Sequence, residues 1–175
     1  MEYTKKVKDL MIPLVDYPHI PYWFSVRQAI AMIKAAAAEP DAKIEPRFVL
    51  VFDEKYQLLG FLGFKEMLMG IEPRFLRRPE AAHVQGAKPA DLDPLLGMLW
   101  KDMFGRGCKE EANKPVKDVM TPVKVTVKAD DPVVKVAYAM IQAGLEIIPV
   151  MEDNKVAGIA RLDDVFKEIT TVVLE

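Results

Sequence analysis

The side chains of this sequence that are capable of covalent or metal chemistry are few and scattered. Its single cysteine, Cys108, has the basic neighbours Arg106 and Lys109, which favour a lowered thiol pKa, but no histidine forms a triad-like group with it. His19 and His83 lack the paired spacing of a zinc site. The chain contains no phosphate-binding loop, dinucleotide-binding glycine motif, serine elbow or zinc-protease pair. We therefore expect no catalytic residue, no metal site and no required cofactor.

The composition restricts the class of protein further. The 175 residues are 51% hydrophobic and carry a formal net charge of -2, with acidic and basic residues interspersed. This charge pattern argues against nucleic-acid binding. A single cysteine permits no intramolecular disulfide and fits a reducing compartment. Because no stretch approaches the roughly 20 apolar residues of a membrane helix and no signal peptide is evident, the sequence predicts a cytoplasmic protein without membrane binding.

The chain contains two copies of one sequence pattern. VKDLMIP at residues 7–13 returns as VKDVMTP at 116–122, with five of the seven positions identical. Two later stretches return in the same order, 26–33 as 134–141 and 49–68 as 148–166. The first copy is longer by an insert, AAEPDAKIEP, whose prolines indicate a loop. An internal duplication therefore organises the sequence.

Each copy has the pattern of a strand, a helix, a two-stranded hairpin and a second helix. In the second copy we expect a strand at 124–128 and a helix from about 132 to 143, with Asp131 as its N-cap and Gly144 as its stop. A closing helix from Asp163 to about Val173 is expected to bury Val165, Phe166, Ile169, Val172 and Val173.

The first copy repeats this order of elements. Ser25 and Gln28 form a capping box before a helix at 26–38, and the strands RFVLVF and LLGFLG follow. Because one copy leaves a face of its three-stranded sheet exposed, the two copies should pack sheet against sheet with their helices outside. We predict an α+β fold of two tandem β-α-β-β-α repeats with pseudo-twofold symmetry and a helical middle segment.

These elements divide the chain into three parts. The first repeat is expected at residues 1–70, a connecting segment at 71–115 and the second repeat at 116–175. In the connecting segment an amphipathic helix is predicted from the spacing of Leu95, Met98, Leu99 and Met103. That helix would cover an intramolecular or dimer surface, or form a lid over a cleft.

The order of residues resembles the CBS (cystathionine β-synthase) domain family, whose repeats occur in pairs called Bateman modules. The resemblance is carried by VKDVMTP, by the apolar helix with Ala137, by the strand IIPV and by the glycine-led strand before the last helix. It covers both repeats and leaves the middle segment outside. It implies regulation rather than catalysis, with an adenine-type nucleotide (AMP, ADP, ATP or S-adenosylmethionine) bound in a cleft between the repeats. It also implies a homodimer.

The resemblance further implies which residues bind the ligand. In the family pattern a glycine is followed three residues later by Thr or Ser and six later by Asp, which hold phosphate and ribose. The second copy has Arg161 and Asp164 at these positions, and the first has Gly63 and Glu66. The retained aspartate favours the Asp164 cleft, where Arg161 would either bind phosphate or fill the space. The candidate ligand-binding residues are Asp164, Arg161, Val125, Thr126, Ile148, Pro149, Glu66, Gly63 and Phe48.

An alternative interpretation is that the chain has this fold but binds no nucleotide. Asp164 in the first turn of a helix also suits the helix dipole, and Arg161 also suits a surface ion pair. The departures of the first copy from the family pattern favour this interpretation. The chain would then be a ligand-independent interaction or dimerisation module with degenerate clefts, which binds a protein partner.

Overall fold

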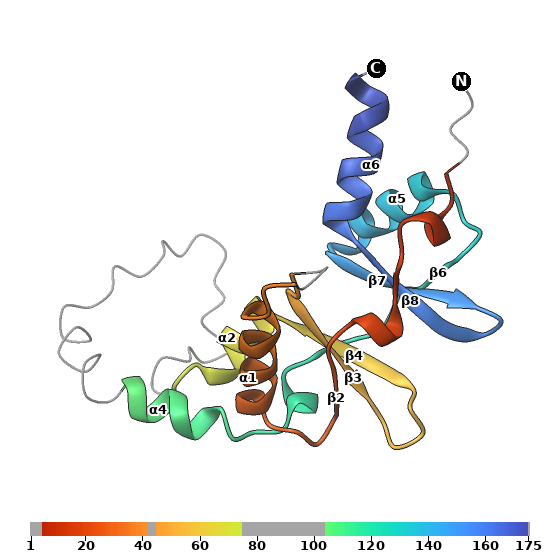
Figure 1. Ribbon diagram of the computed structural model, residues 1–175. Coiled ribbons are helices and arrows are strands. Elements are labelled where there is room, and N and C mark those ends of the chain that lie inside the picture. The colour runs from red at the N-terminus through yellow and green to blue at the C-terminus, as the bar shows by residue number, and fades with distance from the viewer. Residues whose placement is uncertain (1–4, 42–44, 75–103, 175) are drawn as a thin grey trace, which may run out of the picture.

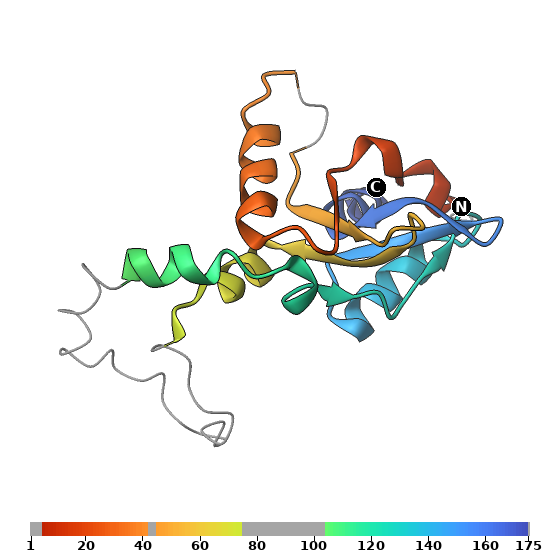
Figure 2. The same cartoon turned by 90° about the horizontal axis from the view of Figure 1, so that it is seen from below.

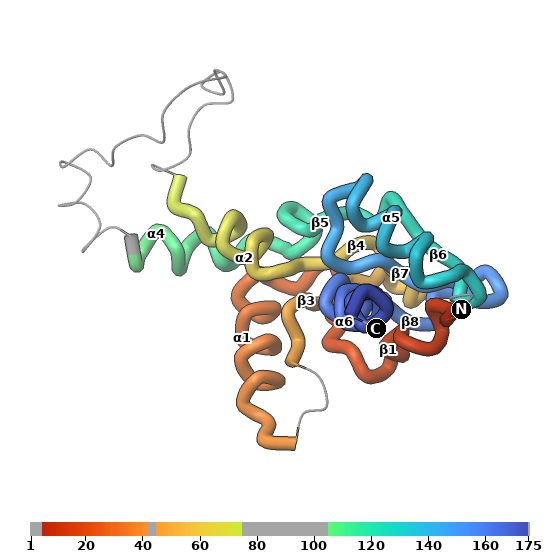
Figure 3. The backbone as a smooth tube through the Cα atoms, turned by 90° about the horizontal axis from the view of Figure 1, so that it is seen from above, coloured from red at the N-terminus to blue at the C-terminus, as the bar shows by residue number. Residues whose placement is uncertain are grey.

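The computed structural model describes residues 5–41, 45–74 and 104–174, and Figure 1 shows how they are arranged. The first repeat contains β2 (His19–Pro21), α1 (Val26–Ala37), β3 (Phe48–Phe52), β4 (Leu58–Gly63) and α2 (Phe64–Ile71). The second repeat contains β6 (Val127–Lys128), α5 (Val133–Ala143), β7 (Ile147–Glu152), β8 (Lys155–Arg161) and α6 (Leu162–Leu174). Helix α4 (Phe104–Glu111) lies between the repeats in the sequence and packs beside α2 (Figure 3). Both repeats follow the predicted order of elements.

A lead-in of one 3-10 turn and one two-residue strand precedes each repeat. These are η1 (Val7–Asp9) with β1 (Ile12–Pro13), and η5 (Val116–Asp118) with β5 (Thr121–Pro122). A further 3-10 turn, η2 (Leu14–Asp16), follows β1. Each lead-in joins the sheet of the opposite repeat, because the strand orders are β1-β8-β7-β6 and β2-β3-β4-β5. Each sheet therefore has one strand more than the three expected, and the two repeats are interlocked.

Backbone hydrogen bonds hold the exchanged lead-ins in place. The Val7 N–H donates to the Asp131 carbonyl over 2.9 Å, and the Val116 N–H donates to the Phe24 carbonyl over 2.7 Å. The two contacts are equivalent, since each joins a lead-in to the segment just before the first helix of the other repeat. An unpaired strand edge exposes backbone donors and acceptors, so each lead-in also covers an edge that would otherwise be open.

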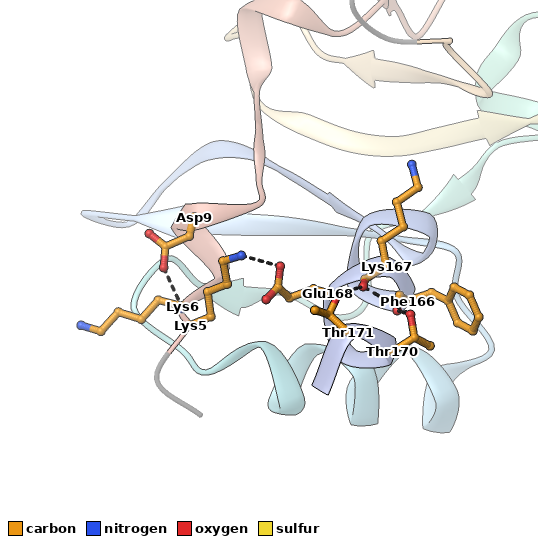
Figure 4. Close-up of polar contacts among 8 residues, drawn as sticks. All are labelled: Lys5, Lys6, Asp9, Phe166, Lys167, Glu168, Thr170 and Thr171. Carbon is orange, nitrogen blue, oxygen red and sulfur yellow. Dashed lines mark hydrogen bonds and ion pairs between the residues drawn. The ribbon is translucent and has the colours of Figure 1, made fainter. Parts of the chain in front are cut away.

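Side chains add to the attachment of the N-terminal lead-in, as Figure 4 shows. The Lys5 ammonium points toward Glu168 of α6 and forms an ion pair with it. The Asp9 carboxylate accepts a hydrogen bond from the Lys6 N–H over 2.9 Å. The lead-in of the first repeat is thus tied to both a strand and a helix of the second.

The two sheets face each other, with helices on their outer sides (Figure 2). In each sheet the first two strands of the repeat are parallel, and the hairpin and lead-in strands are antiparallel. The core between the sheets contains Ile12, Tyr17, Phe48, Leu50, Phe52, Phe61, Ile147 and Ile159. A second core lies between the β2-β3-β4-β5 sheet and the helices of the first repeat, and a third lies between the β1-β8-β7-β6 sheet and the helices of the second repeat. This arrangement confirms the predicted α+β fold class.

The start of α5 differs from the sequence prediction. Asp131 is not its N-cap, because the helix begins at Val133 and its N-cap is Pro132. Asp131 instead accepts the Lys128 N–H over 2.8 Å and closes the turn before the helix. Gly144 ends the helix in the left-handed conformation, with φ 63°, as expected. The strand predicted at 124–128 is restricted to β6.

The buried side of α6 is narrower than predicted. Val165 is 2% exposed, but Phe166, Val172 and Val173 are 66%, 49% and 75% exposed. In Figure 1 the C-terminal half of α6 projects past the other elements of the second repeat, so no core reaches it. The amphipathic helix expected around Leu95 lies outside the described residues.

Candidate functional site

A cavity of about 760 Å³, which we call the first cleft, opens where β4 ends and α2 begins. Its walls come from both repeats: β3, β4 and α2 of the first, and the lead-in and the end of α5 of the second. The polar and aromatic lining residues are Arg47, Phe48, Phe61, Phe64, Lys65, Glu66 and Thr121, with Glu45 and Glu146. A cavity of this size with a few convergent polar groups is typical of a small-molecule site.

Glu66 supplies the carboxylate of the first cleft, and two hydrogen bonds hold it. The Gly63 N–H donates to Oε2 over 2.8 Å, and the Thr121 hydroxyl donates to Oε1 over 3.0 Å. Thr121 reaches Glu66 because β5 pairs with β4, with Thr121 opposite Phe61. The first copy lacks a hydroxyl in its own motif, but the exchanged lead-in of the second copy provides one.

Gly63 leaves room for two of the side chains around it. A Cβ at this position would lie 2.7 Å from Cε1 of Phe48 and 2.9 Å from Oε2 of Glu66. Phe48 packs edge to face on Phe61, with ring centroids 6.1 Å apart, and Phe64 is half exposed. The first cleft thus has aromatic surface, on which a planar ring can pack, next to a carboxylate.

Charged side chains of both signs complete the first cleft. Arg47 and Lys65 are cations suited to phosphate, while the Glu66 carboxylate is an acceptor for sugar hydroxyls. Arg47 also forms an ion pair with Asp163 of α6, with 3.3 Å between Nη1 and Oδ2. One wall of the first cleft is therefore tied to the start of the last helix.

The corresponding place in the second repeat, which we call the second cleft, lies where β8 ends and α6 begins. Strand register establishes the correspondence. Phe48 lies opposite Gly63 in the first repeat, and Ile147 lies opposite Arg161 in the second. In the same way, Thr121 of the lead-in lies opposite Phe61, and Ile12 of the other lead-in lies opposite Ile159. The second cleft therefore has an arginine where the first has a glycine. It also has an isoleucine where the first has a threonine.

Arg161 and Asp164 bind each other where β8 ends and α6 begins. Nε of Arg161 donates to Oδ2 of Asp164 over 2.7 Å, and Nη2 donates to Oδ1 over 3.0 Å. This contact with Asp164 raises the pKa of Arg161 above its ordinary value. Both carboxylate oxygens of Asp164, the residue expected to hold a ribose, are thus engaged by the guanidinium.

Tyr17 lies beside this ion pair, in the core between the sheets. This residue is 2% exposed, and its hydroxyl makes no hydrogen bond of standard geometry within the described part of the chain, although the backbone N–H groups of Arg47 and Phe48 lie near it. Burial raises the pKa of Tyr17 to about 12; the Asp164 charge adds to the rise, while the Arg161 charge and the backbone N–H groups of Arg47 and Phe48 lower the pKa. A neutral phenol therefore stands next to the closed pair.

The structure divides the predicted ligand-binding residues into three groups. Phe48, Gly63 and Glu66 line the first cleft, and Arg161 and Asp164 form the ion pair of the second. Elsewhere, Val125 and Ile148 belong to the core beneath α5 and α6, Pro149 is buried in β7, and Thr126 is exposed. Sequence reasoning missed Arg47, Lys65 and Thr121, because their approach to Glu66 depends on contacts between segments distant in the sequence.

The described residues offer little other chemistry. They contain no group of three or more His, Cys, Asp or Glu side chains that could hold a metal ion. Cys108 lies on α4, where partial burial raises the pKa of its thiol, opposite to the direction expected from its basic neighbours. Among the helices in the described ranges, none is long and apolar enough to cross a membrane.

Comparisons with known proteins agree with this fold. Residues 116–171 match the family model of the CBS domain, whereas no curated protein matches the chain. A solved CBS-domain-containing protein from Agrobacterium tumefaciens is similar, with a TM-score of 0.61, 18% identity, and coverage of 97% of this chain and 96% of that chain. CBSX2 in complex with AMP has a TM-score of 0.59, 18% identity, and coverage of 96% and 98%.

The cytosolic domain of the Mg²⁺ channel MgtE in complex with ATP is also similar, with a TM-score of 0.58, 21% identity, and coverage of 94% of this chain and 48% of that chain. The second repeat is a CBS domain, and the whole chain has the fold of a CBS domain pair, the Bateman module.

Proposed function

We propose that this protein is a non-catalytic regulatory module that binds an adenine-type nucleotide in the first cleft and passes the bound state to a partner. The first cleft carries the proposal, because it combines a cavity of about 760 Å³ with a positioned carboxylate, aromatic surface and two cations. Support comes from structures of the same fold that hold AMP or ATP. The ligand is AMP, ADP, ATP or S-adenosylmethionine.

Each part of a nucleotide has a matching group in the first cleft. Glu66 accepts hydrogen bonds from ribose hydroxyls, and Phe48 and Phe64 offer apolar surface for the base. Arg47 and Lys65 supply positive charge for phosphates. The N-terminus of α2, at Phe64, adds backbone N–H groups that favour an anion.

The first cleft replaces the second as the preferred site of this proposal. The sequence pattern favours Asp164 because it retains the aspartate, but both oxygens of that carboxylate are engaged by Arg161. A ribose would have to displace a charge-assisted pair of hydrogen bonds, which are among the stronger polar contacts in proteins. Glu66 is held by a backbone N–H and a hydroxyl, and it lines an open cavity.

Binding of AMP, ADP, ATP and S-adenosylmethionine by isothermal titration calorimetry tests this function. We expect Glu66→Gln to weaken the affinity about 10- to 100-fold, because a charged hydrogen-bond acceptor is worth about 1.5–3 kcal/mol. Asp164→Asn removes the equivalent carboxylate of the second cleft and should leave the affinity unchanged. Thermal unfolding must show that both variants are folded. Absence of binding by all four ligands would exclude the proposal.

The apolar helix faces support the second candidate function, that of an interaction module. On α5 and α6 the large exposed apolar residues are Val134, Tyr138, Ile141, Leu162, Phe166, Val172, Val173 and Leu174. On the first repeat an apolar groove of about 420 Å³ runs between α1 and α2. Such faces are typical of protein interfaces and support the implied homodimer. A cytoplasmic location stays a prediction.

Analytical ultracentrifugation with and without nucleotide separates the two candidates. A dimer that is unaffected by nucleotides, together with no heat of binding, would select the ligand-independent module. A dimer whose nucleotide affinity depends on Glu66 would select the regulatory one. We expect Phe166→Glu to weaken dimerisation, since it places a charge on the exposed apolar face of α6.

A further inference from the structure

We infer that the second cleft is a closed counterpart of the first, held shut by Arg161, and that removal of the Arg161 side chain creates a second nucleotide site on Asp164. The choice of nucleotide as ligand rests on the proposed function of the first cleft. Arg161 would then determine how many nucleotides one chain binds. The inference is carried by the strand register and by the ion pair.

The backbones of the two clefts are equivalent. In each repeat the hairpin strand that ends at the cleft runs directly into the last helix, and position 63 in β4 corresponds to position 161 in β8. The carboxylates also correspond, since Glu66 and Asp164 lie three residues further along the chain in the first turn of α2 and α6. The clefts differ at two of the corresponding positions: Gly63 has no side chain where Arg161 has a large one, and Thr121 corresponds to Ile12.

The Arg161 side chain occupies the carboxylate that a ligand would need. Its guanidinium uses two donors on the two oxygens of Asp164, so the carboxylate has both of its oxygens bound. The side chains of Arg161 and Asp164 are only 19% and 21% exposed, and water screens such a pair less than it screens a surface pair. Gly63 has no side chain to bind Glu66, so the Glu66 carboxylate accepts hydrogen bonds from the Gly63 N–H and from the Thr121 hydroxyl instead.

The test is the binding stoichiometry of AMP and ATP, measured by calorimetry on the full chain. We expect one nucleotide per chain for the unmodified protein and two for Arg161→Gly. Arg161→Thr serves as a second variant, in case the glycine loosens the end of β8. Adding Asp164→Asn to either variant should return the stoichiometry to one. Arg106→Ala, which removes the same charge from an exposed position on α4, should leave it at one.

The Arg161 variants are compared with the unmodified chain. The inference about Arg161 can therefore fail while nucleotide binding in the first cleft stands, and the reverse. Variants that are folded by thermal unfolding and bind no more nucleotide than the unmodified chain would overturn the inference about Arg161. A gain that survives Asp164→Asn would overturn it as well. An unmodified chain that binds nothing, with variants that bind one nucleotide, would reject the first cleft and uphold the inference.

Discussion

In the first cleft Glu66 accepts hydrogen bonds from Gly63 and Thr121 and faces a cavity, whereas in the second cleft Asp164 is bound through both oxygens by Arg161. The two places share strand register and helix starts. The copy that retains the aspartate is therefore the one whose carboxylate is held by a charged partner. Duplication preserved the backbone of the clefts, while the side chain at position 63 or 161 decides whether the carboxylate is held by neutral donors or by a guanidinium.

The largest loss of stability is expected from changes where the lead-in strands pack on the hairpins, and this loss should be the same in both repeats. A Cβ at Gly158 would lie 2.3 Å from the Ile12 carbonyl oxygen, and one at Gly60 would lie 2.4 Å from the Thr121 carbonyl oxygen. We expect Gly158→Val and Gly60→Val each to lower the free energy of unfolding by about 3 kcal/mol, since backbone must move. Chemical denaturation measures this.

Gly105→Ala is the control for these two variants. Nothing lies within 4 Å of a Cβ at that position on α4, so this change should be neutral or stabilise by up to about 1 kcal/mol. A large loss for Gly158→Val with none for Gly60→Val would show that the two lead-ins are not equivalent in their contribution to stability.

Gly63→Arg should give the first cleft the guanidinium that the second cleft has. The new side chain would displace the Phe48 ring and offer a guanidinium to Glu66. We expect nucleotide affinity to fall by at least about tenfold, or 1.4 kcal/mol, measured by calorimetry. Gly63→Ala adds only the Cβ and should have a smaller effect in the same direction. Unchanged affinity in Gly63→Arg would mean that the first cleft is not the site.

Tyr17→Phe tests the core between the sheets through stability. Removing a buried hydroxyl that makes no hydrogen bond of standard geometry should leave the free energy of unfolding unchanged or raise it by about 1 kcal/mol at neutral pH. The folded-state pKa of Tyr17 is raised from 10.0 to about 12, so its contribution is complete below pH 10 and lost as pH rises through about 12. Tyr17→Phe should therefore lose less stability than the unmodified protein between these pH values. A marked destabilisation at neutral pH would show that the hydroxyl has a partner.

The smallest effect is expected from Asp130, which pairs with Lys6 and Lys8 of the N-terminal lead-in. Hydrogen bonds from Lys8 and Lys6 lower the pKa of Asp130 from 3.8 to about 2. Its contribution to stability is therefore present above pH 3.8 and lost as pH falls through about 2. Asp130→Asn should lower the melting temperature slightly at neutral pH and not at pH 2. The difference should also vanish in 1 M salt, because the pair is exposed.

Local features of the fold could be predicted because neighbouring residues decide them. The capping box of Ser25 and Gln28 starts α1, and Gly144 ends α5. The exposure of Phe166 could not be predicted, since helical spacing shows which residues share a face and not how far the core extends beneath it. The site residues show the same difference between local and long-range features. Glu66 was found from its distance to a glycine, but Thr121 was not.

By itself the sequence determined the duplication, the order of elements in each repeat and the resemblance to CBS domains, because caps, turns and periodicity act between residues a few positions apart. Only the tertiary structure decided which sheet each lead-in joins, and with it the hydroxyl that reaches Glu66. It also decided that Arg161 binds Asp164 rather than remaining free for phosphate. These outcomes depend on contacts between distant segments and on competition among polar partners. Neither can be predicted from the spacing of residues along the chain.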